Sequence, residues 1–217
     1  MDRRKFLTTT FLGIAGLTLM PLSCTVLKSE STLNPDLETT LKSDSKKYNG
    51  WVRYALRQSK KENVILINKS EYTLDFLADA KILLRCPVEL GFGPLDDKQV
   101  EGDGSTPEGI YSASKKIPAQ QSKYYKAILI DYPTAENWQN FNKKKADGII
   151  PPHAQIGGLI EIHGTGSGVK GNDVNEVGSN WTSGCVALSN KDMDQLYDMV
   201  RLGTPIIIVR YTSVKYK

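Results

Sequence analysis

The 217-residue sequence is short of the side chains that bind metals, with only 2 histidines and 3 cysteines. Zinc sites in proteins use closely spaced pairs of cysteine and histidine, and the sequence contains no such pair. His153 lies in the proline-rich segment "PPHAQIGG", whereas His163 follows an apolar run at a distance from it. The sequence therefore predicts no metal site and no cofactor.

Charge of one sign and long hydrophobic runs are also scarce. The 28 Lys and Arg against 24 Asp and Glu leave a net charge of +4, and no basic patch with interleaved aromatic residues indicates nucleic-acid binding. The mildly apolar stretch of residues 6–20 is short for a membrane span, which needs about 20 apolar residues. Hence we expect no nucleic-acid partner and a globular domain rather than a membrane-spanning one.

The N-terminus has the order of an export signal, with a basic start before the apolar stretch. The segment "RRKFL" resembles the twin-arginine signal, and "LMPLSC" resembles a bacterial lipobox that would place a lipid on Cys24. We expect residues 1–24 to be an export signal and the protein to act in the periplasm or cell envelope. Membrane attachment through a Cys24 lipid and an uncleaved N-terminal anchor are two further interpretations.

Composition changes again after the signal. Residues 25–46 are polar and rich in Ser and Thr, which is typical of a tether. Residues 47–61 place Trp51, Tyr54 and Ala55 at helical spacing, so we expect a short helix packed on the domain. The predicted organisation is a tether over 25–61, a catalytic domain over 62–211 and a tail over 212–217.

The predicted domain is mainly β. Three β-leaning runs, "NVILINKS", "EYTLDFLAD" and "AKILLRCPVELGFG", indicate consecutive antiparallel strands, and "IYSASKKI", "KAILIDYP", "GGLIEIHG" and "TPIIIVRY" indicate further strands. A long loop over 94–106 is rich in Gly, Pro and Asp, and such loops are often functional. The segment "SNKDMDQLYDMVRLG" predicts a helix capped by Ser189 or Asn190 and closed by Gly203. This balance favours a β-sandwich or partly closed barrel with a few short helices.

Two cysteines lie inside the predicted domain. Cys86 falls in an apolar run and is expected to be a small buried hydrophobe, although a disulfide to Cys185 is an alternative in an exported protein. Cys185, between Gly184 and the apolar "VAL", has four interpretations: packing residue, metal ligand, half of a disulfide, or nucleophile.

A nucleophilic role would need a base or cation that lowers the pKa of the thiol. His163 qualifies because it ends the apolar run "GGLIEI" and is followed by the glycine-rich "GTGSG". Gly184 leaves the backbone amides beside the sulfur unobstructed, and two such amides could hold the oxyanion of a tetrahedral intermediate.

The motifs together resemble the YkuD-type L,D-transpeptidase catalytic domain of bacterial cell-wall enzymes. The matching segments are "TPEGIY", "IEIHGTGS", "SGCVALSNKDMDQLY" and "GTPIIIV", in the order that the family has. The resemblance covers about residues 62 to 211, and "EGDGSTPEG" further resembles a branch of the superfamily with hydrolytic members. It implies a role in cell-wall biogenesis.

The resemblance also implies the roles of individual residues. Cys185 would be the nucleophile, and His163 its general base and later the acid. The carbonyl of Gly164 would orient His163, and the amides of Gly184 and Cys185 would bind the oxyanion. Ser183 matches the family's Ser or Thr two places before the cysteine and, with Thr165, would contact the substrate. Trp181 is either a packing residue or, because it lies close to the cysteine in the sequence, part of the substrate pocket.

The implied substrate is a peptidoglycan stem peptide. A Cys185 thioester would pass to an amine and form a cross-link between third residues, or attach a lipoprotein as acceptor. The alternatives are a carboxypeptidase that hydrolyses the same bond, or an inactive wall-binding lipoprotein. One departure is that Val186 and Ala187 follow the cysteine, where family members often have Arg or Asn; another is an insertion of residues 169–181.

Overall fold

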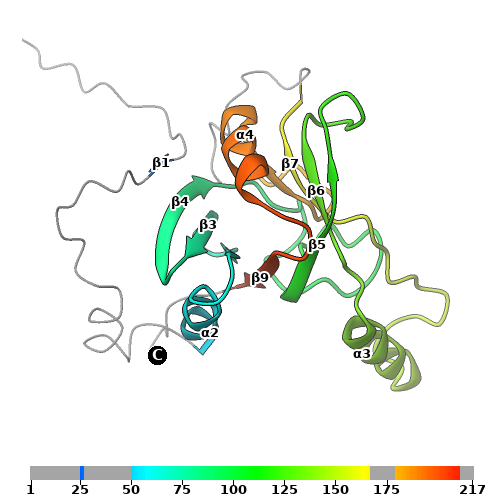
Figure 1. Ribbon diagram of the computed structural model, residues 1–217. Coiled ribbons are helices and arrows are strands. Elements are labelled where there is room, and N and C mark those ends of the chain that lie inside the picture. Colours follow the sequence, from blue (N-terminus) through cyan, green and yellow to red (C-terminus); the bar gives the residue numbers. More distant parts are fainter. Residues whose placement is uncertain (1–24, 27–49, 167–178, 211–217) are drawn as a thin grey trace, which may run out of the picture.

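The computed structural model of the protein describes residues 25–26, 50–166 and 179–210. Its centre is a sheet of nine strands in the order β1-β4-β3-β2-β9-β5-β6-β7-β8 (Figure 1). The strands are β1 Thr25–Val26, β2 Val64–Asn68, β3 Thr73–Ala78, β4 Lys81–Pro87, β5 Gly109–Ile117, β6 Ala127–Ile130, β7 Glu161–Gly164, β8 Val186–Leu188 and β9 Pro205–Val209.

Three helices accompany the sheet: α2 Gly50–Gln58, α3 Ala135–Ala146 and α4 Asn190–Met199. Figure 1 shows α4 lying across β6 and β7 at one end of the sheet, with α2 near β9 and α3 at the opposite end. Ser189 caps α4 by accepting a hydrogen bond from the amide of Asp192. It is one of the two residues that the sequence predicted as the cap of this helix.

The apolar β2–β4 region forms an antiparallel meander, as the three successive apolar runs predict. The last strand, β9, lies inside the sheet: it runs parallel to β2 and antiparallel to β5. Every residue of β2 is buried, because its two faces contact different clusters. Ile65 and Ile67 join the main core, whereas Val64 and Leu66 pack with Ala55 of α2.

The chain beyond β4 nearly closes the sheet into a barrel. Glu89 pairs antiparallel with Ala187 of β8, and Gly91 pairs with Thr182. Glu89 and Ala187 exchange backbone hydrogen bonds of 2.9 and 2.8 Å. The expectation of a mainly β fold with a partly closed barrel is confirmed, and the closure brings the segment after β4 to the strand that follows Cys185.

Three details differ from the sequence-based expectations. In α2, Ala55 is buried but Trp51 and Tyr54 are exposed, so the small residue makes the packing contact. Helix α3 was not predicted. Gly203 does not close α4, which ends at Met199 with Val200 as its C-cap. The positive φ of Gly203, 84°, instead serves the turn into β9.

The cysteines also require a correction. Cys86 is fully buried and disulfide-bonded, whereas Cys185 is free. The predicted burial of Cys86 in the core is confirmed, but its sulfur is in a disulfide, and the alternative of a Cys86–Cys185 disulfide is wrong. An apolar strand buries a thiol and a disulfide equally well, so the local sequence does not separate them.

The export signal over 1–24, with Cys24, lies outside the described residues, as do most of the tether, most of the insertion at 169–181 and the tail. Within the described part of the chain, no helix is long and apolar enough to cross a membrane.

Candidate active site

Cys185 lies at the entrance to β8, beside the start of β7. Its Sγ accepts a hydrogen bond from the Glu161 amide at 3.4 Å, and the thiol donates to the Leu159 carbonyl at 3.7 Å. Leu159 has a positive φ of 56° and a side chain that is 79% exposed. A positive φ is a strained conformation for leucine, and such strain is found mainly beside functional sites, as here next to the sulfur.

The turn that presents Cys185 is held by Thr182. Its buried hydroxyl donates to the Cys185 carbonyl at 2.7 Å and accepts from the Gly184 amide at 3.2 Å. Gly184 has a φ of 125°, and a Cβ there would lie 2.8 Å from the Ser105 carbonyl oxygen. Glycine is therefore required by conformation and by close packing, which adds to the predicted reason that a side chain would obstruct the amides.

His163 lies within β7, and its ring is oriented by its own neighbour. Nδ1 is 2.7 Å from the Gly164 carbonyl oxygen. A carbonyl oxygen only accepts, so Nδ1 carries the proton and Nε2 keeps a lone pair. A Cβ at position 164 would collide with Asn190 Oδ1, which explains the glycine. The neutral imidazole is thus held in the tautomer that a general base needs.

Two aromatic side chains enclose the imidazole. Tyr124 stacks on the His163 ring with centroids 4.7 Å apart and planes at 24°. Trp181 meets it edge-on at 5.7 Å and 68°. The histidine is 1% exposed, so the rings fix its position and exclude water from it.

The strand register places the base and the nucleophile on one face. In the parallel β7–β8 pair, Ile162 is opposite Val186 and His163 is opposite Ala187. Side chains alternate between the faces of a strand, so His163 and Cys185 project to the same side from neighbouring rows. The resemblance implies that the two side chains work together, and this register is compatible with that.

Burial sets the protonation of both groups. It lowers the pKa of His163 below its ordinary 6.5, against the opposing effect of the Gly164 carbonyl. It raises the pKa of Cys185, and the negative charge of the Glu161 side chain adds to this; together they outweigh the hydrogen bond from the Glu161 amide and the positive charge of Lys98, which lower the pKa. The expectation of a low-pKa thiol is therefore wrong for the resting protein, which holds a neutral thiol and a neutral imidazole.

The loop after β4 forms the other side of the site. The backbone of Gly91 is in such close contact with Gly104 and Gly184 that a Cβ at position 91 would collide with both. Nearby, Lys98 is buried and donates to Asp103 at 2.8 Å. Burial alone would raise the pKa of Asp103, but hydrogen bonds from Lys98 and three backbone amides outweigh it and lower that pKa. This ion pair braces the loop beside Cys185.

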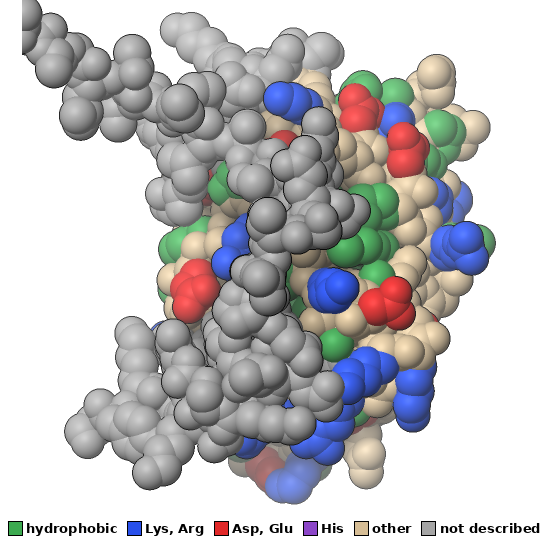
Figure 2. Space-filling model, turned by 60° about the vertical axis from the view of Figure 1, so that its left-hand side comes forward, with side chains coloured by type: hydrophobic (Ala, Val, Ile, Leu, Met, Phe, Trp, Pro, Cys, Tyr) green, Lys and Arg blue, Asp and Glu red, His purple; other side chains and the backbone are tan. Residues whose placement is uncertain are grey.

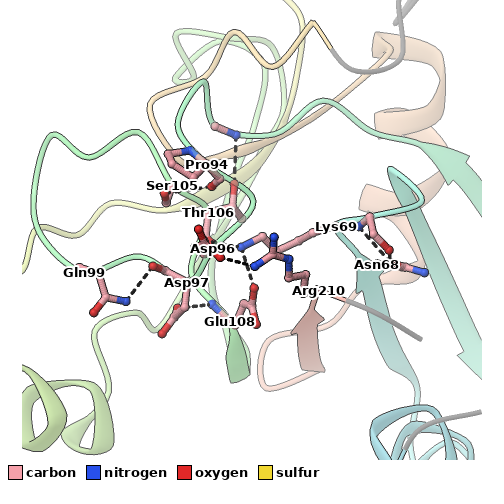
Figure 3. A network of polar contacts seen from close by, with 12 residues as sticks. Asn68, Lys69, Pro94, Asp96, Asp97, Gln99, Ser105, Thr106, Glu108 and Arg210 are labelled. Atoms are coloured by element: carbon pink, nitrogen blue, oxygen red, sulfur yellow. Dashed lines mark hydrogen bonds and ion pairs between the residues drawn. The ribbon is translucent and has the colours of Figure 1, made fainter. Parts of the chain in front are cut away.

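A second lysine anchors the same loop from behind (Figure 3). Lys69 follows β2, is 1% exposed, and donates to the carbonyls of Asp96 and Thr106 at 2.9 and 2.7 Å and to Glu108 at 3.0 Å. Thr106 Oγ1 in turn accepts from the Gly91 amide at 3.0 Å. The loop is therefore tied both to the barrel and to the backbone that contacts Gly184.

The remaining predicted residues lie close to this site with unequal contacts. Trp181 packs on His163, whereas Ser183 is exposed beside Cys185. Thr165 is buried, and its hydroxyl has no partner among the described residues. Sequence reasoning missed Thr182, Tyr124 and Glu161. Thr182 stands three positions before the cysteine, so its spacing was a usable signal; Tyr124 had none.

The described residues contain no group of three or more His, Cys, Asp or Glu side chains arranged to hold a metal ion. On the face that Figure 2 shows, acidic and basic side chains are interspersed, with hydrophobic side chains between them.

Comparisons with known proteins identify the family of this chain. The model of the L,D-transpeptidase catalytic domain family, YkuD, matches residues 62–208. The chain is 29% identical over 143 residues to "Putative L,D-transpeptidase YafK" of Escherichia coli K12, a match over 63% of this chain and 46% of that protein. It is 28% identical over 123 residues to "Putative L,D-transpeptidase YqjB" of Bacillus subtilis, over 52% of this chain and 61% of that one. The chain spans about half the length of the curated relatives it matches.

Similarities to solved structures are more distant. The helical cell shape determining protein Pgp2 from Campylobacter jejuni superposes with a TM-score of 0.48 and 20% identity, over 76% of this chain and 57% of that one. An L,D-transpeptidase from Xylanimonas cellulosilytica gives a TM-score of 0.46 and 16% identity, over 68% and 60% of the two chains.

Proposed function

Because the chain belongs to the L,D-transpeptidase catalytic domain family, we propose that it is an exported cysteine enzyme acting on peptidoglycan stem peptides. The observation that carries this proposal is the bond of 2.7 Å between His163 Nδ1 and the Gly164 carbonyl. It leaves Nε2 of a buried, neutral imidazole free to take a proton, on the strand beside the only free cysteine of the described residues.

Acylation begins from the neutral pair. His163 takes the thiol proton of Cys185, and the thiolate attacks the carbonyl between the diamino acid at stem position three and D-alanine at position four. The amides of Cys185 and Gly184 bind the oxyanion, which requires the Gly184 amide to leave Thr182 Oγ1, its partner at 3.2 Å. His163 then protonates the departing D-alanine amine, and the tripeptide remains as a thioester on Cys185.

Three kinds of acceptor can take the acyl group from the Cys185 thioester. An amine of a neighbouring stem peptide gives a cross-link between third residues, and an amine of a lipoprotein gives a protein–wall link. Water gives a free tripeptide, the product of an L,D-carboxypeptidase. Leu159 and Ser183 are exposed beside Cys185, and we place the approach of the acceptor, whether amine or water, on this side of the sulfur. An inactive wall-binding lipoprotein is the less favoured reading.

We place this chemistry in the periplasm or cell envelope, which the basic and apolar N-terminal segment supports. Attachment to the membrane through a lipid on Cys24 is an alternative that competes with the disulfide of Cys86 for the same thiol, because the chain has 3 cysteines and Cys185 is free. It would be checked by metabolic labelling with a radioactive fatty acid, using Cys24→Ala as the control; absence of label in the parent protein contradicts it.

The test of the activity is mass spectrometry of disaccharide tetrapeptides incubated with the protein. Dimers lacking one D-alanine, absent with Cys185→Ala, are the expected result. Tripeptides alone would replace the transferase by the carboxypeptidase. Unchanged tetrapeptides would contradict both.

A further inference from the structure

The sulfur of Cys86 in β4 is bound in a disulfide. The chain has 3 cysteines, and Cys185 carries a free thiol. Elimination therefore leaves Cys24, which directly precedes β1 in the sequence, as the other half of the bond. Disulfides form and persist in oxidising compartments, so the bond also supports export of the protein.

The register of β1 on β4 leads to the same partner. Thr25 is opposite Arg85 and Val26 is opposite Leu84 in an antiparallel pair. Extending this register by one residue places position 24 opposite Cys86. Opposite Cα atoms in an antiparallel pair are about 4.5 to 5.5 Å apart, and disulfide-bonded Cα atoms are usually about 4.4 to 6.8 Å apart. The register is therefore compatible with a bond between these two positions.

The bond lies on the core-facing side of β4. Leu84 and Cys86 are both 0% exposed and belong to the main core. Arg85, between them, points to the other face, where its guanidinium donates to the Asp75 carboxylate at 2.6 and 2.7 Å. Residues directly opposite each other present their side chains on one face, so position 24 faces the core with Cys86. A disulfide in this position is shielded from thiols in solution.

We propose that Cys24 stays in the exported protein as the disulfide partner of Cys86, and that it carries no lipid. A sulfur atom bonded to Cys86 cannot also form the thioether that attaches a lipid to a lipobox cysteine. Any cleavage of the signal then has to leave Cys24 in the mature chain. The inference goes beyond the proposed activity, because it concerns how the catalytic domain is joined to its N-terminal segment.

The bond changes the meaning of the predicted tether. At one end, β1 pairs with β4 at the edge of the sheet (Figure 1), and the disulfide fixes it there. At the other end, α2 begins at Gly50 and buries Ala55 against β2. Residues 27–49 therefore join two points of the same domain and are not a spacer between membrane and domain. With an uncleaved N-terminal anchor, the edge at β4 would lie next to the membrane.

Formation of the bond removes two electrons from the pair of cysteines. The oxidant is a protein disulfide of the exported compartment that acts by thiol–disulfide exchange. The thiolate of Cys24 attacks that disulfide, and a mixed disulfide forms as the S–S bond of the oxidant breaks. The sulfur of Cys86 then displaces the oxidant from Cys24 as β1 pairs with β4. The oxidant leaves as a dithiol, with the two electrons and the two thiol protons.

The test maps the cysteines of the full-length protein after export by bacterial cells. Thiols are blocked with N-ethylmaleimide during lysis and again after denaturation, and the protein is digested with trypsin without a reductant. The expected product is a peptide ending at Lys28 that is joined through sulfur to residues 86–98, with maleimide on Cys185 alone. Maleimide or a lipid on Cys24, or a mature chain that begins after Cys24, would overturn the inference.

Thermal unfolding distinguishes the bond from the two side chains that form it. A reductant should lower the melting temperature of the parent protein by about 5 to 15 °C, because it opens the loop from Cys24 to Cys86. Cys24→Ala should melt with the reduced parent protein, whether or not the reductant is present. Thr25→Ala, the matched control in β1, keeps both cysteines and should keep the effect of the reductant. Equal melting of the oxidised and reduced parent proteins would contradict the bond.

The proposed activity is judged separately from the disulfide. Release of D-alanine is measured for the parent protein and Cys24→Ala below both unfolding transitions, and equal rates are expected because Cys185 is free in both. If neither protein releases D-alanine, the proposed function falls, while the peptide map still decides the disulfide. If release is normal and the map shows free thiols, only the disulfide falls.

Discussion

The two faces of the strands β5 to β8 have the same backbone and opposite roles. On one face, Ile128, Ile162 and Val186 are buried in the core. On the other face lie Glu161, His163 and Cys185. Ile162 and His163 are adjacent in sequence, yet the first packs the core and the second is expected to move protons.

The two faces show how a reactive site can be rigid with few polar contacts of its own. The apolar face fixes the strands through burial, so the polar face needs few supports of its own. His163 requires one hydrogen bond and two aromatic contacts. The loop over 91–108 packs Leu95 and Val100 against the core and is held in addition by the buried lysines Lys69 and Lys98.

The largest expected effect is on the reactive face. His163→Gln should lower the rate of D-alanine release about 10²- to 10⁴-fold, because glutamine fills the space without serving as a general base. Thermal unfolding of the variant serves as the control for folding. A variant that stays within tenfold of the parent rate would remove His163 from the mechanism.

The adjacent residue should give the opposite result. Ile162→Ala leaves a cavity in the core and should lower the free energy of unfolding by about 2 to 5 kcal/mol, measured by urea denaturation. Below the unfolding transition its rate of D-alanine release should stay within about fivefold of the parent. A large loss of rate without loss of stability would contradict the separation of the two faces.

Gly184→Ala tests the turn that joins both faces to the loop. The φ of 125° and the approach of 2.8 Å to the Ser105 carbonyl should cost about 1 to 3 kcal/mol of stability. Because the turn must shift, D-alanine release should fall as well. Differential scanning calorimetry and the release assay measure the two effects, and a variant equal to the parent in both would refute the packing argument.

Lys115 and Lys116 offer the closest comparison between the faces. Lys116→Met removes the cation that donates to the last carbonyls of α4 and should cost about 1 kcal/mol without changing D-alanine release. Lys115→Met should leave the free energy of unfolding unchanged. Equal stability losses in urea denaturation would contradict the assignment of the two lysines to different faces.

The smallest expected effect is a flat pH profile of kcat/KM between about pH 7 and pH 8.5. The pKa of His163 lies below its ordinary 6.5 and that of Cys185 above its ordinary 9.0, so the neutral pair persists between them. The free energy of unfolding should be highest in the same pH window. Below pH 6.5 the unfolded chain takes up a proton at His163 more readily than the folded chain, and above pH 9.0 it loses one at Cys185 more readily, so the free energy of unfolding falls on both sides. A rate that titrates inside this window would indicate a thiolate–imidazolium pair.

The sequence predicted the parts of this account that depend on local pattern. The strands follow from apolar runs, and Cys185 and His163 stand in short motifs next to glycines that the structure requires. Ser189 caps α4 as expected because a cap depends on adjacent residues.

Long-range contacts escaped prediction. Lys69 meets Thr106 across 37 positions, and neither residue stands in a recognisable motif. Glu161 became a candidate only when the register placed it beside Cys185. Helix α3 has a capping box from Thr134 to Asn137 and buries only Phe141, so it shows neither the usual Glu or Gln of that box nor an apolar period.

The most direct test of the central claim is the intact mass of the protein after acid quenching during turnover of a disaccharide tetrapeptide. We predict an adduct equal in mass to the acyl group left after loss of D-alanine, located on Cys185 by peptide mapping and absent from Cys185→Ala. Turnover by Cys185→Ala, or an adduct on any other residue, would contradict it.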